Sequence, residues 1–254
     1  MVVQAEEGQG RLTGTGRTPR ILVATAVPAE RDAVASGLSA GADAAGAADT
    51  PGGGLVSVGP VDVLAVGVGP AAAAAGTAAA LAGAAARDVP YDLVVSAGIG
   101  GGFVPDAPVG SLVVADAVTA ADLGAETADG FVPVTDLGFG RVTYEPPAAL
   151  VRQLAAVSGA ATGTVLTVST VTGSAERAAG LRARHPRALA EAMEGFGVAE
   201  AAAVHGLPVC EVRAVSNPVG PRDRAAWRIG DALAALGGAF GKFTPVLESW
   251  NRHD

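Results

Sequence analysis

Short apolar runs alternate along this chain with longer, alanine-rich segments. The short runs have the length and the Val, Ile and Leu content of buried strands, whereas the longer segments have the length of helices. Repeated alternation of the two kinds is typical of an α/β fold with a largely parallel central sheet. We predict strands at 21–27, 61–66, 93–97, 111–118, 164–170 and 209–216, and helices at 29–38, 70–86, 148–157, 175–184, 193–205 and 224–240.

Three segments between these elements contain several glycines, and two of them also contain proline. Residues 39–54 are predicted as a loop or a weak edge region. Residues 98–102 are predicted as a turn, and residues 119–147 as a long functional loop region. No repeat, linker or shift of composition divides the chain. We therefore expect a disordered leader at 1–19, a single domain over 20–241 and a C-terminal tail at 242–254.

Charge and cysteine content exclude several classes of protein. The chain has 25 acidic residues against 17 Lys and Arg, and the net charge of −8 argues against nucleic-acid binding, which requires a basic face. The single cysteine, Cys210, excludes a disulfide framework and a cysteine-rich zinc site. Three histidines without metal-ligand spacing disfavour a protein-bound catalytic metal.

One uncharged stretch, residues 63–86, is long enough to cross a bilayer. Its second half is almost entirely alanine and glycine, and Gly69-Pro70 interrupts the middle, whereas a spanning helix is richer in Leu, Ile and Phe. We interpret the stretch as a buried strand followed by a helix that packs on the sheet. We therefore expect a soluble, cytoplasmic protein without a membrane partner.

The segment Gly67-Val68-Gly69-Pro70-Ala71-Ala72 has the G-x-G-x-x-A spacing of dinucleotide-binding turns. Such spacings arise by chance in a chain with 36 glycines. Pro70 also removes a backbone N–H at the helix start, where a pyrophosphate needs donors. A tight turn without a ligand explains the segment, so an NAD-dependent oxidoreductase is the weakest functional alternative.

Glycine and polar residues stand at the ends of several predicted strands. The glycine-rich segment 98–102 permits positive φ and a close approach of the backbone to a ligand. Glu30 follows the first strand, Asn217 ends the last, and Glu194 stands at a helix start. Because ligands bind at the carboxyl ends of strands in open α/β sheets, Glu30, the glycine segment and Asn217 are placed to converge. Each also has an ordinary structural interpretation. Glu30 is then a solvated acid in a first helical turn, the glycine segment a flexible turn, and Asn217 part of an Asn-Pro turn.

Several motifs occur in a characteristic order. They are 21–30, Gly67-Val68-Gly69, 96–103, 109–116, Thr172-Gly173-Ser174, Met193-Glu194-Gly195 and 212–217. In this combination the chain resembles the nucleoside phosphorylase and nucleosidase superfamily over about residues 20–241, in particular the 5′-methylthioadenosine/S-adenosylhomocysteine nucleosidases. Within that group it is most similar to the futalosine hydrolases, on residues 122–126, 137–140 and 216–223.

The resemblance implies a three-layer α/β/α sandwich around a mixed, largely parallel sheet, and a hydrolase without a metal or organic cofactor. It implies Glu30 as the general base for water, Glu194 as the ligand of the ribose hydroxyls and Asn217 as the group that reads the base. The partner would be a small purine nucleoside, and the assembly a homo-oligomer, a dimer or a tetramer. Further implied contacts of the nucleoside are Gly98, Ile99, Gly100, Gly101, Phe103, Met193 and Ser216.

The chain departs from its relatives at three places. The methylthioadenosine nucleosidases have Asp where this chain has Asn217. They also have a base-stacking Phe where this chain has residues 174–177, so a stacking ring must come from Phe103 or Phe139 or be absent. The phosphorylases carry a phosphate-binding Arg at the start of the glycine-rich segment. Ser96-Ala97-Gly98 has none, which favours water as the nucleophile.

The similarity to futalosine hydrolases implies release of hypoxanthine from futalosine, leaving dehypoxanthine futalosine, a step of menaquinone biosynthesis. Hypoxanthine offers acceptors at N7 and O6 and a donor at N1, and the amide of Asn217 can donate to the acceptors. The carboxyphenyl group of futalosine requires a cation, for which Arg141, Arg222 and Arg224 are candidates. Three alternatives stay open: another purine nucleosidase, for methylthioadenosine, S-adenosylhomocysteine or aminofutalosine; a phosphate-dependent nucleoside phosphorylase; and a non-catalytic nucleoside-binding protein.

Overall fold

A mixed sheet forms the centre of the molecule. The computed structural model describes residues 18–41, 48–49 and 54–251. Strand β1 (Ile21–Thr25) runs parallel to β4 (Val61–Ala65) on one side and to β5 (Leu93–Gly102) on the other. The sheet continues past β5 with β12 (Val209–Pro218), β6 (Leu112–Ala120), β10 (Ala161–Thr167) and β11 (Ala188–Ala192), and past β4 with β3 (Leu55–Val58) and β2 (Ala48–Asp49).

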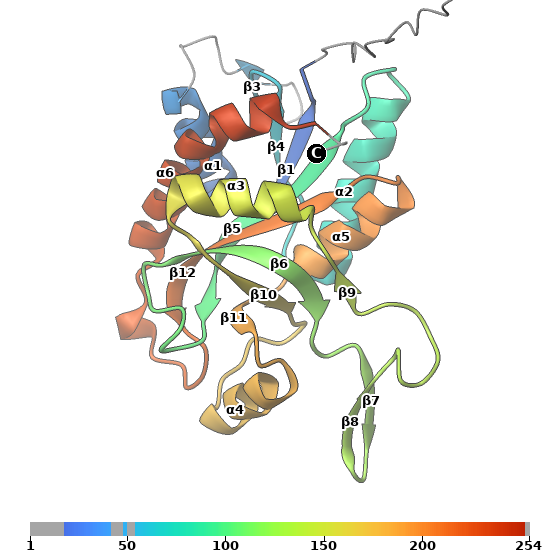
Figure 1. The fold of residues 1–254 in the computed structure, drawn as a ribbon, viewed down its shortest axis with the longest axis vertical. Helices are drawn as coiled ribbons and strands as arrows, with labels where there is room; N and C mark the ends of the chain where they lie inside the picture. The colour runs from blue at the N-terminus through green and yellow to red at the C-terminus, as the bar shows by residue number, and fades with distance from the viewer. Residues whose placement is uncertain (1–17, 42–47, 50–53, 252–254) are drawn as a thin grey trace, which may run out of the picture.

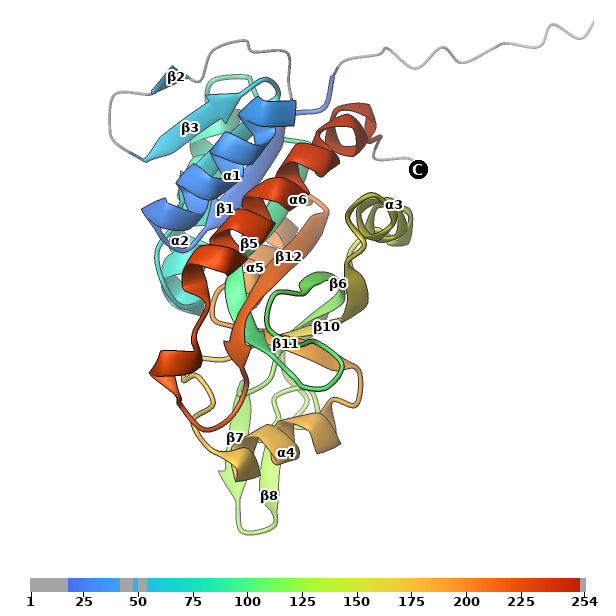
Figure 2. The ribbon, with the colours of Figure 1, turned by 90° about the vertical axis from the view of Figure 1, so that its left-hand side faces the viewer.

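The two faces of the sheet carry separate apolar cores. Ile21 and Val23 belong to one cluster, whereas Leu22 and Ala24 belong to the other, as the two-residue period of a strand requires. Helices α1 (Pro28–Gly41), α3 (Ala148–Ser158) and α6 (Ile229–Ser249) cover the first face, and α2 (Pro70–Ala85) and α5 (Gly195–Val204) cover the second (Figures 1 and 2). The expected three-layer α/β/α architecture is confirmed.

Strand β5 is longer than its sequence pattern predicts. The prediction of a turn at 98–102 is wrong, because β5 pairs with β12 as far as Gly102 and its last residues also pair with β11. These glycines do not adopt positive φ. They make room instead: a Cβ on Gly100 would lie 2.8 Å from the carbonyl oxygen of Glu191 on β11. Because β11 pairs with both β10 and β5, this end of the sheet closes on itself.

The hydrophobic pattern of the sequence does not predict several short strands. Residues 119–147, predicted as a loop, contain the hairpin of β7 (Gly124–Thr127) and β8 (Gly130–Pro133), and the short strand β9 (Thr143–Tyr144). Strand β11 was missed because its alanine-rich sequence favours a helix in isolation. Helix α4 (Ala175–Arg184) has the predicted bounds.

The last helix differs from the prediction at both ends. It begins at Ile229, after a 3-10 turn at Arg224–Ala226, and continues to Ser249, so the stretch predicted as a tail from residue 242 is largely helical. Helix α6 packs on α1 backbone to backbone, since a Cβ on Gly41 would lie 2.6 Å from the carbonyl oxygen of Gly241, and one on Gly37 would overlap Gly237. The predicted leader, up to residue 17, and most of the predicted loop at 39–54 lie outside the described residues.

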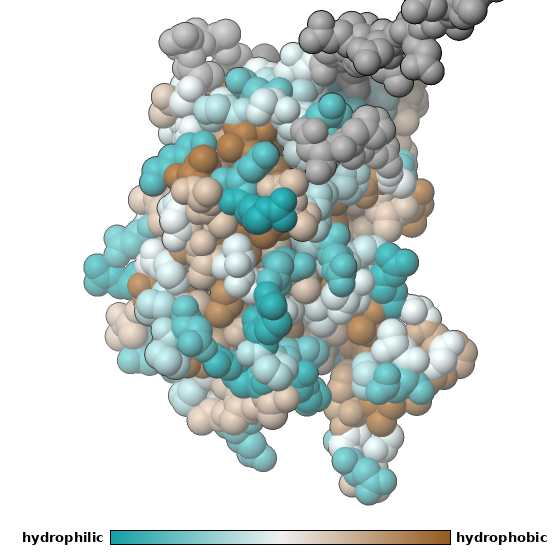
Figure 3. All heavy atoms as spheres, viewed as in Figure 1, coloured by the Kyte–Doolittle hydropathy of each residue, from teal (hydrophilic) through white to brown (hydrophobic). Residues whose placement is uncertain are grey.

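Figure 3 shows a face on which hydrophilic and hydrophobic residues are mixed, with hydrophobic residues on the projecting β7–β8 region and also in the upper part of the face near α6. On and beside this hairpin, Leu123, Leu137 and Phe139 are 42%, 43% and 70% exposed. Within the described parts of the chain, no helix is both long and apolar enough to span a membrane.

Candidate active site

A pocket of about 240 Å³ lies where β1, β5 and β12 reach their carboxyl ends. The three polar residues singled out in the sequence, Glu30, Glu194 and Asn217, all line it, although they come from α1, the start of α5 and β12. Five of the other expected contacts also line this pocket: Ile99, Gly100, Gly101, Met193 and Ser216.

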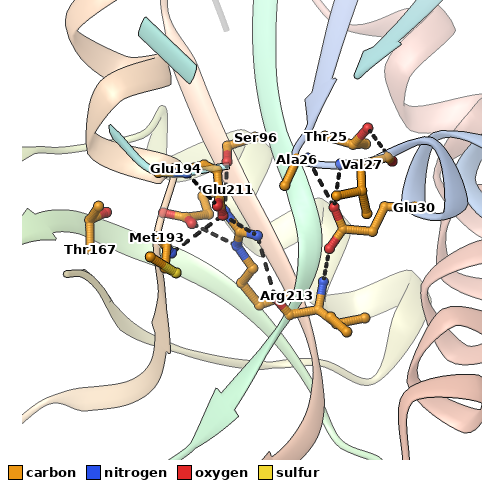
Figure 4. Close-up of polar contacts among 12 residues, drawn as sticks. Thr25, Ala26, Val27, Glu30, Ser96, Thr167, Met193, Glu194, Glu211 and Arg213 are labelled. Carbon is orange, nitrogen blue, oxygen red and sulfur yellow. Dashed lines mark hydrogen bonds and ion pairs between the residues drawn. The ribbon is translucent and has the colours of Figure 1, made fainter. Parts of the chain in front are cut away.

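The carboxyl group of Glu30 is fixed by backbone N–H groups of two elements. Its Oε2 accepts from Ala26 N at 2.9 Å and from Val27 N at 3.3 Å, and its Oε1 accepts from Ile99 N at 2.9 Å (Figure 4). The side chain is 4% exposed. A carboxylate has about four acceptor positions, so these three bonds leave one for a water in the pocket.

The carboxyl group of Glu194 is held by the turn that links β4 to α2. Its Oε1 accepts from Gly69 N at 3.1 Å, and its Oε2 from Met193 N at 3.3 Å. Gly67 and Gly69 have φ angles of 104° and 89°, which a residue with a side chain adopts only with strain. The Gly-x-Gly segment therefore has a structural explanation as a turn that positions Glu194.

Arg213 lies buried behind the pocket and links its acidic residues. Its Nε donates to Glu211 Oε1 at 2.8 Å, its Nη2 donates to Ser96 Oγ at 3.1 Å, and its Nη1 lies 3.4 Å from Glu194 Oε2 (Figure 4). Burial works to lower the pKa of Arg213, but the charges of Glu211, Glu194 and Glu30 outweigh burial and raise it. The guanidinium therefore stays charged and balances the surrounding carboxyls.

Gly98 belongs to this buried layer and does not line the pocket, contrary to the expectation of a nucleoside contact. A Cβ on Gly98 would lie 2.5 Å from Arg213 Nη1 and 2.6 Å from Glu30 Oε1. The absence of a side chain at this position is what allows the acid and the guanidinium to approach β5 together.

Glu211 is the least satisfied group of the cluster. It is fully buried, and its Oε2 has no hydrogen-bond partner. Burial raises the pKa of this carboxyl, and the attraction of Arg213 opposes that effect. Sequence reasoning missed both Glu211 and Arg213, although two charges in the otherwise apolar strand 209–216 were a usable signal. In the part of the chain that the structure describes, no group of three His, Cys, Asp or Glu side chains is arranged to hold a metal.

The amide of Asn217 is oriented by its neighbours. Ser216 Oγ lies 2.8 Å from Asn217 Oδ1, and Asn217 Nδ2 donates to the carbonyl oxygen of Pro218 at 3.0 Å. The hydroxyl donates to Oδ1 and so fixes which end of the amide carries the NH₂ group. One N–H of that group is left to donate to a bound ligand.

The aromatic side chain on the pocket wall is Trp227, which the sequence did not single out. Phe103, expected to contact the nucleoside, is 3% exposed and packs in a small core cluster outside the pocket, while Phe139 is exposed elsewhere. Arg222 also lines the pocket, with its guanidinium 5.2 Å from the centre of the Trp227 ring. Arg141 and Arg224, the other two cation candidates, do not line it.

A third acidic residue, Glu191 on β11, also lines the pocket and was missed in the sequence. Its Oε1 accepts from Thr172 N at 2.7 Å, and its Oε2 accepts from Thr172 Oγ1 at 2.5 Å. Burial raises the pKa of Glu191, and the two bonds from Thr172 oppose that effect. No sequence signal marked it, because β11 itself was not predicted.

The α/β/α fold and a pocket with fixed acids and an oriented amide fit a nucleoside-cleaving enzyme, and the family model of the phosphorylase superfamily matches residues 20–242. The chain belongs to this superfamily and, within it, to the futalosine hydrolases, as its sequence motifs indicated. It is 70% identical to the futalosine hydrolase of Streptomyces coelicolor over 92% of this chain and 99% of that protein. It is 48% identical to the futalosine hydrolase of Acidothermus cellulolyticus, over 86% of this chain and 88% of that protein.

Solved structures share the fold. A 5′-methylthioadenosine/S-adenosylhomocysteine nucleosidase from Colwellia psychrerythraea, in complex with adenine, matches with a TM-score of 0.74 and 22% identity, over 92% of this chain and 98% of that chain. A futalosine hydrolase of Helicobacter pylori matches with a TM-score of 0.70 and 20% identity, over 91% of this chain and 97% of that chain. At these identities the likeness shows the fold alone.

Proposed function

We propose that this protein hydrolyses the N-glycosidic bond of futalosine and releases hypoxanthine and dehypoxanthine futalosine, in the cytoplasm and as a step of menaquinone biosynthesis. The observation that carries the proposal is the meeting of Glu30, Glu194 and Asn217 in one pocket. The 70% identity to the Streptomyces coelicolor futalosine hydrolase supports the choice of substrate.

In the proposed reaction, water adds to C1′ of the ribose while the C1′–N9 bond breaks and its electron pair enters the purine. Glu30 holds the water and takes its proton, which finally reaches the departing hypoxanthine. Glu194 hydrogen-bonds the ribose hydroxyls, and its negative charge lies near the ribosyl cation as it develops. Met193 packs on the ribose face, and the free N–H of Asn217 donates to N7, where negative charge accumulates.

The charge of the pocket supports water rather than phosphate as the nucleophile. A phosphate dianion needs a fixed cation or several donors. The guanidinium of Arg213 lies behind Gly98 and is already engaged by Glu211 and Glu194. The acids on the pocket side of this layer would repel a second anion beside C1′.

The outer part of the pocket supports a large anionic substituent on the substrate. Trp227 offers an aromatic ring against which a phenyl group can pack, and Arg222, whose guanidinium lies over that ring, offers a cation for a carboxylate. Arg222 is therefore our choice among the three cations considered in the sequence.

We also propose a homo-oligomer. The exposed side chains of Leu123, Leu137 and Phe139 on and beside the projecting hairpin form an apolar surface of the kind that a second copy covers. Light scattering should give a mass above that of one chain, and replacing Phe139 with Asp should lower it.

The function is tested by incubating the protein with futalosine, inosine and methylthioadenosine, with and without phosphate, and measuring the free base by chromatography. We expect hypoxanthine from futalosine at a rate that is independent of phosphate. A ribose-1-phosphate-type product, or a rate that rises with phosphate, would show a phosphorylase instead. Binding of futalosine without any turnover would show a non-catalytic binding protein.

A further inference from the structure

Glu191 is a buried carboxyl on the pocket wall that the proposed reaction does not use. It is 5% exposed and lies on β11, while Asn217 lies on β12. Both residues are in register with the same residue of β5, since Glu191 pairs with Gly101 across the antiparallel β11–β5 contact and Asn217 pairs with Gly101 across the parallel β12–β5 contact. The three residues therefore form one row across the sheet.

Residues in register on neighbouring strands present their side chains on the same face. Glu191 and Asn217 accordingly both line the pocket, with two strand spacings, roughly 10 Å, between their backbones. The residue between them is glycine, and the side chain of Val219 lies over it, with Cγ2 2.9 Å from the position of a Cβ on Gly101. Val219 also lines the pocket, so a flat ring can pack against it, with the amide at one end and the carboxyl at the other.

The carboxyl of Glu191 is prepared to accept a hydrogen bond. Thr172 donates to both of its oxygens, through its backbone N–H and its hydroxyl, which fixes the plane of the group. Each carboxyl oxygen can accept a second bond, so both keep an acceptor position that the bonds from Thr172 do not use. Covering the remaining acceptor positions of this carboxyl with an apolar ring costs free energy. A ligand with a hydrogen-bond donor at that place avoids the cost and is therefore preferred.

We propose that Glu191 accepts the N1–H of a 6-oxopurine whose N7 and O6 face Asn217, and that it thereby sets the preference for hypoxanthine over adenine. This inference rests on the proposed function and deepens it. In a 6-oxopurine N1 carries a hydrogen and donates, whereas in a 6-aminopurine N1 is a bare acceptor. An adenine ring in the same place would set its N1 lone pair against a carboxylate oxygen, two acceptors without a hydrogen between them, and mispairing of this kind discriminates strongly between substrates.

The test compares futalosine with its 6-amino analogue in the wild type, Glu191→Gln and Glu191→Leu. In Glu191→Gln the oxygen can keep the bond from Thr172 N, and the NH₂ group then faces the ring as a donor. We expect kcat/KM for futalosine to fall about 100-fold and that for the 6-amino analogue to stay the same or rise. Glu191→Leu should lose futalosine turnover without any gain for the analogue.

Glu248→Gln, the same change on the exposed part of α6, is the matched control and should alter neither substrate. Melting temperatures check that the variants fold, and inhibition by free hypoxanthine and adenine gives a second measure of base preference. An equal loss for both substrates in Glu191→Gln would overturn the inference and leave Glu191 a structural residue. A wild-type enzyme that does not cleave futalosine would instead overturn the proposed function, and the comparison of inosine with adenosine would still test Glu191.

Discussion

Backbone N–H groups hold Glu30 in place, and backbone N–H groups together with the guanidinium of Arg213 hold Glu194. Glu30 accepts from Ala26, Val27 and Ile99, and Glu194 accepts from Gly69 and Met193. Such contacts orient the two carboxyls before any substrate enters, which is what positioning and electrostatic catalysis require.

Replacing either acid with its amide should therefore remove catalysis and leave the fold. We expect Glu30→Gln and Glu194→Gln each to lower kcat on the order of 100-fold or more, the usual scale for losing one acid–base or electrostatic group. Initial rates with saturating futalosine measure the effect. Turnover close to the wild-type rate in either variant would remove that residue from the mechanism, and a collapse of the melting temperature would make it structural.

Asn217 is expected to read the purine from the end opposite Glu191. In Asn217→Asp the donor to N7 is replaced by an acceptor, so futalosine hydrolysis should fall by several orders of magnitude, far more than cleavage of the 6-amino analogue. The kcat/KM values of the two substrates give the result. Equal losses would mean that Asn217 serves only the turn before Pro218.

Arg222 is expected to bind the anionic substituent of the substrate. Loss of one charged hydrogen bond weakens binding by about 1.5–3 kcal/mol, so Arg222→Ala should raise KM for futalosine by roughly 10- to 100-fold. Inosine, which lacks the substituent, should be cleaved as before. Arg141→Ala is the matched control, because Arg141 stacks on Tyr144 outside the pocket. A similar KM for inosine and futalosine in the wild type would contradict the assignment.

At the scale of elements, the site depends on how closely β5 approaches its neighbours. A Cβ at Gly98 would meet both Arg213 and Glu30, so Gly98→Ala should displace the acid and reduce kcat at least tenfold, with a lower melting temperature. Gly180→Ala in α4 is the control, since nothing lies within 4 Å of the added carbon. That change should stabilise the helix by about 0.5–1 kcal/mol and leave activity unchanged. Full activity in Gly98→Ala would show that this contact is not required.

The sequence predicted these elements with uneven success. Apolar runs located β1, β4, β6, β10 and β12, because burial on both faces leaves a run of Val, Ile and Leu. The same rule failed for β11, where alanine satisfies the tight packing of a strand and also favours a helix. It failed for the second half of β5, where glycine is selected for space rather than for a turn.

Part of the site could be predicted from the sequence because its residues stand next to predicted elements. Glu30, Glu194 and Asn217 stand beside predicted elements and could be placed at strand or helix ends. Glu191, Arg213 and Trp227 could not be assigned, since their roles depend on strand register and on a turn that local sequence does not specify. Phe103 lies in a core cluster and does not line the pocket, because an aromatic after a glycine segment can turn to either side of the sheet.

At the scale of the whole molecule, Cys210 reports on the central sheet. It lies fully buried in β12, and burial raises the pKa of its thiol to about 12. We expect no reaction with a thiol reagent at pH 8 in the native protein and one equivalent after denaturation. The labelling rate should follow global unfolding and slow further with bound hypoxanthine. Rapid labelling of the native protein would show that the sheet opens locally.

The contact between α1 and α6 also has a consequence for how the enzyme is made. The glycine face of α1 and the β1 side chains beneath it are covered by a helix that begins at Ile229, near the other end of the chain. At the usual rate of protein synthesis, roughly 10–40 s separate the emergence of these two helices from the ribosome. Throughout that interval the nascent chain displays an uncovered apolar surface, and Glu30, on the same helix, has no completed pocket to act in. Chaperone binding to nascent chains should therefore continue until translation reaches the final helix.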